Sequence, residues 1–211
     1  MAEVGRRTVD YYFYGQSPFT LFGHRALKEM ADRQGVALNL KPVDLPVLWA
    51  TSGAVMPAQR PAVRQRYRLL ELQRIADERG LAINVRPRHF PTAIALADRC
   101  TIAILESGGD PFDFVEAVGR GVWCDEADMG DEAEIAARLT AHGHDAAATI
   151  ERAKSDAIEA IRQRNSEEAV AADAVGVPAY VLDGEVFWGQ DRIDALERMI
   201  ASGREAFRND I

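Results

Sequence analysis

The stretch TVDYYFYGQSPF, residues 8–19, decides the fold, because a strand pattern ends in it where a helix pattern begins. β-Branched and aromatic residues fill 8–14, which is typical of a strand. Ser17 then fits an N-cap, and Pro18 fits the first helical position, where its missing N–H costs nothing. Apolar residues recur at helical spacing up to a stop at Gly35, and 36–43 alternates as a second strand. This β-α-β order favours a parallel strand pair and an α/β layer fold.

The middle of the chain is mostly helical in pattern. The segment from Pro46 first contains several Pro, Gly and Ala residues that are typical of loops, and a basic amphipathic helix then extends to about Gly80. Further helices are predicted from Pro91, after Asp110-Pro111 to near Gly119–Gly121, and from Asp145 to about Val175, the last as one helix or two.

The chain returns to strands near its end. VPAYVLDGEVFWG, residues 177–189, reads as two short strands joined by Asp183-Gly184, which is a strong hairpin signal. A last helix follows. We therefore predict an α/β protein with a thioredoxin-like fold (β-α-β … β-β-α) in two parts, 1–45 and 173–211, interrupted by an all-α insertion domain at 46–172.

Composition excludes several classes of function. The 211 residues are 47% hydrophobic and 27% charged, and the net charge of −8 without a dense Lys/Arg block argues against nucleic acid. No apolar run is long enough for a membrane span, and MAEVGRRTVDYY is not a signal peptide, so we expect the cytoplasm. Cys100 and Cys124 are expected to be free thiols, with no metal site among them and the histidines.

Ser17 is the first candidate for chemistry. A helix N-terminus presents unpaired N–H groups and a partial positive charge, so it stabilises an anion. The serine hydroxyl can also donate a hydrogen bond to a thiolate that a ligand brings. Taken alone, a plain helix cap is the simpler interpretation of Ser17.

Two later loops offer further contacts. In a thioredoxin-like fold, the proline before the third strand is cis and faces the first helix, so Val177 before Pro178 could pair with an extended peptide. Gly189 and Gln190 open the last helix, where amides could bind a carboxylate and Asp191 an ammonium group. An ordinary strand-entry proline and a plain N-cap are the alternatives.

Together, the three loops fit one ligand. They converge at one end of such a sheet. They offer a hydrogen-bond donor for a thiolate, backbone groups that can pair with an extended peptide, and groups that can bind the carboxylate and ammonium of an amino acid. Glutathione is a short peptide with a thiol, extended amides and an α-amino-acid end. Arg64 could pair with its glycyl carboxylate, although a solvated helix arginine is the alternative.

Several motifs in this order resemble a known family. They are YYFYGQSPFTLFGH, PAVRQRYRLL, RHFPTAIAL, VWCDEADMGDEAEI and GVPAYVLDGEVFWGQDRID. The chain resembles the 2-hydroxychromene-2-carboxylate isomerases and the related kappa-class glutathione transferases, within the DsbA-like thioredoxin superfamily. The resemblance implies a glutathione site, with Ser17 at the sulfur and Arg64 where the family usually has a lysine. The other implied contacts are Val177, Pro178, Gly189, Gln190, Asp191 and Arg192.

Two departures from the family concern the acceptor site. Ala54 and Ala93 stand where the family often has asparagine. The glutathione site therefore looks largely kept, while the acceptor site looks altered.

The resemblance implies a glutathione-dependent cis–trans isomerase of an aromatic-degradation intermediate, acting by reversible thiolate addition. Phe19, Trp49 and Trp188 could line an aromatic pocket, whereas Tyr11 and Tyr12 are expected in the core. The alternatives are a kappa-like glutathione transferase or peroxidase, and a glutathione- or partner-binding protein without turnover. A disulfide oxidoreductase is disfavoured because the chain has no Cys-x-x-Cys. A homodimer is implied by the family only.

Overall fold

The computed structural model describes residues 7–208. Within them the strands form one four-stranded sheet in the order β2-β1-β3-β4. β1 runs parallel to β2 and antiparallel to β3, and β3 runs antiparallel to β4. This arrangement confirms the predicted thioredoxin-like order of elements. The strands are β1 (Thr8–Phe13), β2 (Ala37–Pro42), β3 (Ala179–Leu182) and β4 (Glu185–Trp188).

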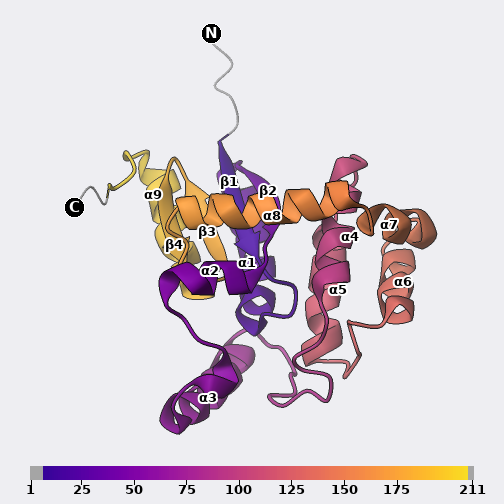
Figure 1. The fold of residues 1–211 in the computed structure, drawn as a ribbon. Coiled ribbons are helices and arrows are strands. Elements are labelled where there is room, and N and C mark those ends of the chain that lie inside the picture. The colour runs from indigo at the N-terminus through magenta and orange to yellow at the C-terminus, as the bar shows by residue number, and fades with distance from the viewer. Residues whose placement is uncertain (1–6, 209–211) are drawn as a thin grey trace.

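Helices form most of the remainder of the described chain, and those from α2 to α8 lie between β2 and β3 in sequence (Figure 1). The domain boundaries at 45/46 and 172/173 stay a prediction. The helices are α1 (Pro18–Gln34), α2 (Leu45–Ser52), η1 (Pro57–Gln59), α3 (Ala62–Glu78), α4 (Ala95–Glu106), α5 (Phe112–Trp123), α6 (Glu132–Ala141), α7 (Ala146–Ala153), α8 (Asp156–Ala171), η2 (Gln190–Arg192) and α9 (Ile193–Ser202).

Alternate residues of β1 face two layers of helices. Val9, Tyr11 and Phe13 are buried against α1 and α9 on one face. Tyr12 is buried on the other face, in a cluster that includes Leu48 of α2 and residues of α8. Figure 1 shows α2 and α8 crossing that face of the sheet. Tyr11 and Tyr12 are therefore core residues, as predicted.

A second core lies among the inserted helices. Phe114, Trp123 and Ile135 are among its large side chains, and each is at most 1% exposed. Leu21 and Phe22 of α1 belong to this core, while other residues of α1 pack on the sheet. Because α1 is shared by both cores, its N-terminus is fixed at their junction.

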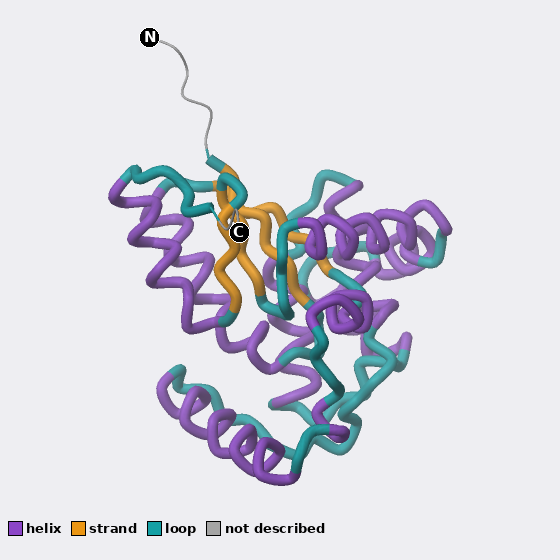
Figure 2. The backbone as a smooth tube through the Cα atoms, turned by 60° about the vertical axis from the view of Figure 1, so that its left-hand side comes forward, coloured by secondary structure: helices purple, strands orange, loops and turns teal. Residues whose placement is uncertain are grey.

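Helix α3 projects from the rest of the molecule (Figures 1 and 2). Leu72 and Ala76 are its buried residues. Near its C-terminal end, Arg79 Nη2 donates a 2.9 Å hydrogen bond to Gln190 Oε1 and so ties α3 to η2. The first turns of α3 are exposed.

Three predicted helix boundaries are wrong. The fourth helix begins at Ala95 instead of Pro91, because the backbone N–H of Thr92 is bound by the Gln16 side chain. α5 ends at Trp123, two residues beyond the predicted Gly119–Gly121, and Gly119 packs against Leu21, where a Cβ would lie 3.2 Å from a Leu21 methyl carbon. The stretch from Asp145 forms two helices, which is one of the two expectations, but the second helix ends at Ala171 instead of near Val175.

Helix α2 is absent from the elements that the sequence predicts. Pro46 and Gly53 look like loop punctuation, but Pro46 lies in the first turn of α2 and Gly53 is its left-handed C-cap, at φ 71°. In residues 7–208, no helix combines the length and apolarity that crossing a bilayer requires.

Candidate functional site

Ser17 caps α1. Its backbone is extended, at φ −74° and ψ 124°, and its Oγ accepts a long 3.4 Å hydrogen bond from the Thr20 amide. Accepting this bond leaves the hydroxyl proton free to be donated. The first turn of α1 contains no acidic residue, so no side chain there neutralises the positive end of the helix. Ser17 is buried, with 8% of its surface exposed.

Gln16 fixes the loop that leads into α1. Its side-chain Nε2 donates to Tyr14 Oη at 2.8 Å and to the Thr92 carbonyl at 3.0 Å, while its Oε1 accepts from the Thr92 amide at 3.0 Å. The Trp123 indole Nε1 donates to the Gln16 carbonyl at 3.0 Å. The loop before Ser17 is therefore held by groups from two distant segments of the insertion. Sequence reasoning misses this role, because a lone glutamine carries no local signal.

Asp98 lies directly beneath the same loop. Its Oδ1 accepts a 3.0 Å hydrogen bond from the Gly15 amide, and its buried Oδ2 has no hydrogen-bond partner among residues 7–208. A Cβ at Gly15 would lie 2.6 Å from Oδ1, so the close approach requires glycine. Burial raises the pKa of Asp98 from 3.8 to about 8. In sequence it resembles an ordinary acid in the first turn of a helix.

The proline loop and the turn before α9 lie together. The Val177-Pro178 peptide is cis, and the Gly189 amide donates a 2.9 Å hydrogen bond to the Pro178 carbonyl. Gly189 has φ 110°, which favours glycine. A Cβ at Gly23 of α1 would lie 3.0 Å from Gln190 Cβ, so η2 packs closely on α1. The structure thus brings the predicted proline loop and last-helix turn against the helix that Ser17 caps.

Asp191 is not a plain N-cap. It lies within η2, and α9 begins at Ile193 without a side-chain cap. Its exposed carboxylate forms a 3.2 Å ion pair with the equally exposed Arg192. Gln190 is nearly buried and bonded to Arg79, so it is occupied within the protein. Asp191 and Arg192 are the charged groups of this turn that face solvent.

Arg64 is exposed in the first turn of α3. Within residues 7–208 no hydrogen bond or ion pair joins it to Ser17, so the structure does not bring these two predicted site residues into contact. Burial lowers the pKa of Arg60, which precedes the same helix, and the charge of Arg64 lowers it further.

The predicted aromatic pocket is not a single cluster. Phe19 packs edge-on to Phe22, at a ring-centroid distance of 6.3 Å, within the insertion core. Trp49 packs against the cluster that contains Val177. Trp188 is 53% exposed, and its indole ring covers Gly176.

The protein's own thiols are unsuited to nucleophilic chemistry. Burial raises the pKa of Cys100 to about 12, and it also raises the pKa of the half-buried Cys124. Both are free. Residues 7–208 contain no group of three His, Cys, Asp or Glu side chains that could hold a metal ion.

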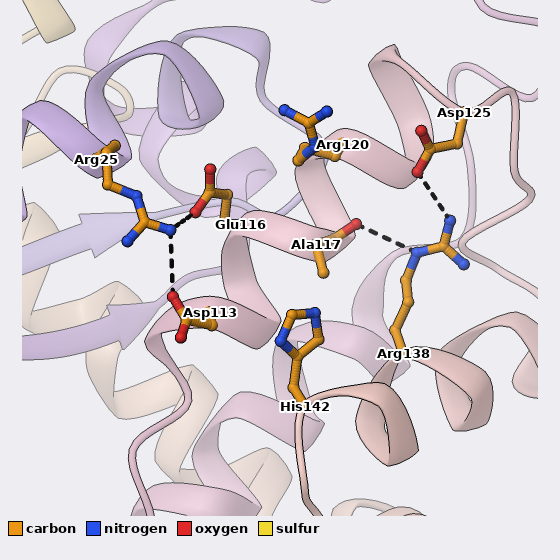
Figure 3. A pocket seen from close by; sticks show the side chains of 8 residues that line it. All are labelled: Arg25, Asp113, Glu116, Ala117, Arg120, Asp125, Arg138 and His142. Carbon is orange, nitrogen blue, oxygen red and sulfur yellow. Dashed lines mark hydrogen bonds and ion pairs between the residues drawn. The ribbon is translucent and has the colours of Figure 1, made fainter.

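A charged hollow of about 540 Å³ lies between α1, α5 and α6 (Figure 3). Arg25 pairs there with Asp113 and Glu116, and Arg138 donates to the Ala117 carbonyl and pairs with Asp125. The predicted site residues lie elsewhere. The lining is Arg25, Asp113, Glu116, Ala117, Arg120, Asp125, Arg138 and His142.

The family of the chain follows from a match over nearly its whole length. Residues 8–201 match the DSBA-like thioredoxin domain. The chain belongs to this family. The loop before its first helix carries Ser17, and the loop before β3 carries Val177-Pro178, as the geometry above describes.

Two relatives and one solved structure are similar over the full fold. The 2-hydroxychromene-2-carboxylate isomerase of Sphingobium xenophagum is 28% identical over 193 residues, 90% of this chain and 96% of that protein. The Pseudomonas putida enzyme of that name is 28% identical over 204 residues, 95% and 97% of the two chains. A solved structure of 2-hydroxychromene-2-carboxylate isomerase gives a TM-score of 0.75 at 24% identity, covering 92% of this chain and 95% of that one. The structural likeness concerns the fold.

Proposed function

We propose that this DSBA-like family member is a glutathione-dependent cis–trans isomerase acting on an aromatic-degradation intermediate such as 2-hydroxychromene-2-carboxylate. The names of the two relatives support the isomerase reaction. The observation that carries the glutathione dependence is Ser17, a hydroxyl at an uncompensated helix N-terminus in a protein whose own thiols have raised pKa values. Such a site favours a thiolate that it does not itself supply.

The residues present fit glutathione. Bound glutathione would supply a thiolate that adds reversibly to the substrate double bond, so that rotation can occur and the thiol is recovered. Ser17 Oγ would donate its proton toward the sulfur position, and the positive end of α1 would face the same charge, although Pro18 has no N–H and the Thr20 amide is bound to Ser17 Oγ. Lowering a bound thiol's pKa by two units corresponds to about 3 kcal/mol.

The remaining contacts orient the peptide. Val177 before Pro178 offers backbone groups to an extended ligand, and Asp191 offers a carboxylate to an ammonium group. Arg64 has no carboxylate partner among residues 7–208 and would pair with the glycyl carboxylate. We assign the reaction to the cytoplasm, where glutathione is kept reduced.

A kappa-like glutathione transferase is the second candidate. Ala54 and Ala93, where amide side chains are expected, favour it over the isomerase at the acceptor side of the site. A glutathione- or partner-binding protein without turnover is the third.

Product analysis separates the candidates. The wild type is incubated with 2-hydroxychromene-2-carboxylate and reduced glutathione, and both are quantified over time. Isomerisation with an unchanged glutathione pool supports the proposal, whereas stoichiometric loss of glutathione supports the transferase. Ser17→Ala should lose most of the rate, while Ser202→Ala at the end of α9 is the matched control. Binding without either reaction would support the third candidate.

A homodimer also belongs to the proposal. Val47, Val55 and Met56 near α2, and Val63 and Tyr67 on α3, are exposed apolar side chains. Their burial against a second copy would remove this surface from water. Analytical ultracentrifugation tests it, and a monomer at high protein concentration would contradict it.

A further inference from the structure

Three arginines recur at intervals of four residues along α3 and the segment before it: Arg60, Arg64 and Arg68. None of them forms an ion pair with a carboxylate of residues 7–208. Arg74, later on the same helix, is different, since it pairs with Glu71 at 2.6 Å. Within the described chain, the three arginines are therefore a run of positive charge without counter-ions.

Arg68 is the least solvated of the three. Its guanidinium carbon lies 5.7 Å from the ring centroid of Phe90 and 5.7 Å from that of Trp123, so the two rings shield part of it. Burial lowers the pKa of Arg68, and the nearby charge of Arg60 lowers it further. The Arg68 guanidinium is thus partly removed from water and is repelled by the positive charge of Arg60. A bound anion would offset both the desolvation of Arg68 and its repulsion from Arg60.

Arg60 is oriented by the loop before α3. Its Nε donates a 3.0 Å hydrogen bond to the Val55 carbonyl, while its terminal guanidinium nitrogens have no partner among residues 7–208. Burial lowers the pKa of Arg60 too, with a contribution from Arg64. Arg60 and Arg68 therefore both present N–H donors without a carboxylate partner among residues 7–208, and a planar carboxylate can accept from such donors in pairs.

This arginine pair is connected to the loop that precedes Ser17. Trp123, which Arg68 overlies, donates its indole N–H to the Gln16 carbonyl at 3.0 Å. Phe90 lies two residues before Thr92, whose backbone Gln16 holds. Trp123 thus contacts both Arg68 and the Gln16 carbonyl, and it links Arg68 to the loop before Ser17.

We propose that Arg60 and Arg68 form a carboxylate subsite that binds the carboxylate of the aromatic substrate. The inference rests on the proposed isomerase function and specifies its substrate side. Arg64, which is exposed in the first turn of α3, is left to the glycyl carboxylate of glutathione. The two arginines would recognise the carboxylate through its charge and its two acceptor oxygens.

The first test does not depend on glutathione or on activity. Benzoate is titrated into the wild type while the indole N–H resonance of Trp123, assigned with Trp123→Phe, is followed by NMR. We expect a saturable shift that weakens with added salt. Arg68→Met and Arg60→Met should each weaken benzoate binding at least tenfold, and Arg66→Met, an exposed arginine of the same helix, should leave it unchanged. No benzoate binding by the wild type, or equal binding by Arg68→Met, would overturn the subsite.

The second test separates the two carboxylates. Arg68→Met should raise KM for the aromatic substrate at least tenfold with little change in kcat or in glutathione affinity, and Arg68→Lys should recover part of the loss. Arg64→Met should weaken glutathione binding and leave KM for the aromatic substrate nearly unchanged. If Arg68→Met weakens glutathione but not substrate, the arginine belongs to the glutathione site and the proposal is wrong.

The proposed function can fail separately. A wild type that binds benzoate as described but neither binds glutathione nor turns over substrate would contradict the isomerase and keep the subsite. Thermal unfolding of each variant identifies loss of fold, and Arg68→Lys keeps the charge if Arg68→Met proves unstable.

Discussion

Replacement of Asp98 by asparagine should change how the stability of this protein depends on pH. In the folded state burial raises the pKa of Asp98 to about 8, against 3.8 for a solvated aspartate. The hydrogen bond from Gly15 and the charge of Arg162 lower the pKa, and the charge of Asp44 raises it, but burial dominates. Burial raises the pKa of Tyr14 as well, and the charge of Asp98 raises it further.

The sign follows from proton binding. Between these two pKa values the folded protein holds a proton on Asp98 that the unfolded chain releases. The free energy of unfolding therefore falls as pH rises through this window, by about 1.4 kcal/mol per pH unit for one proton. At pH 7 the accumulated cost is about 4 kcal/mol, present in the wild type and absent from Asp98→Asn.

Asparagine keeps the acceptor for the Gly15 amide but places an N–H₂ group where Oδ2 has no partner among residues 7–208. Such a buried donor costs about 1–3 kcal/mol, so the net gain at pH 7 is smaller than the full linkage value. The slope of the unfolding free energy against pH does not depend on the cost of this buried donor, so the slope is the sharper measurement.

The assay is urea unfolding at pH 5, 6, 7 and 8. We expect the difference in unfolding free energy between Asp98→Asn and the wild type to grow steadily in favour of the variant over this range. Asp77→Asn, which removes an exposed carboxylate of α3, should run parallel to the wild type. A difference for Asp98→Asn that stays constant from pH 5 to 8 would refute the protonated, buried carboxyl group.

Three further changes have defined outcomes. Gly23→Ala should destabilise the fold by about 1–3 kcal/mol in urea unfolding, because its Cβ would lie 2.8 Å from Tyr180 Oη and 3.0 Å from Gln190 Cβ; a neutral result would mean that β3 and η2 are not packed on α1 as described. Trp123→Phe should cost about 1 kcal/mol beyond the lost ring area, because the Gln16 carbonyl loses its donor, and amide hydrogen exchange at residues 15–17 should quicken; unchanged exchange would contradict this support. Asp191→Asn should weaken glutathione binding about tenfold in calorimetry but leave the binding of a glutathione analogue without the α-amino group unchanged; equal losses for both ligands would contradict an ammonium contact.

The parts of this protein that the sequence predicted are governed by local rules. The strand ending before Gly15, the cap at Ser17 with Pro18 after it, and the hairpin at Asp183-Gly184 each depend on residues within one turn of each other. Their positions in the structure follow from backbone preferences that few neighbours can override.

The missed features depend on contacts between distant segments. Asp98 binds the amide of Gly15 across 83 positions, and Gln16 binds Thr92 across 76. The second of these contacts also explains why the helix predicted from Pro91 begins later. Arg68 looks like any solvated helix arginine until the fold places two aromatic rings beneath it. Spacing along the chain contains no information about such pairs.

The most direct test of the central claim is the thiol pKa of bound glutathione. Glutathione is titrated by calorimetry against the wild type and Ser17→Ala, and thiolate absorbance is followed across pH in each complex. We predict saturable binding and a bound thiol pKa well below the free value of about 8.5, with a higher value in Ser17→Ala. Absence of binding, or the same thiol pKa in both proteins, would contradict the assignment of a thiolate to Ser17 and the N-terminus of α1.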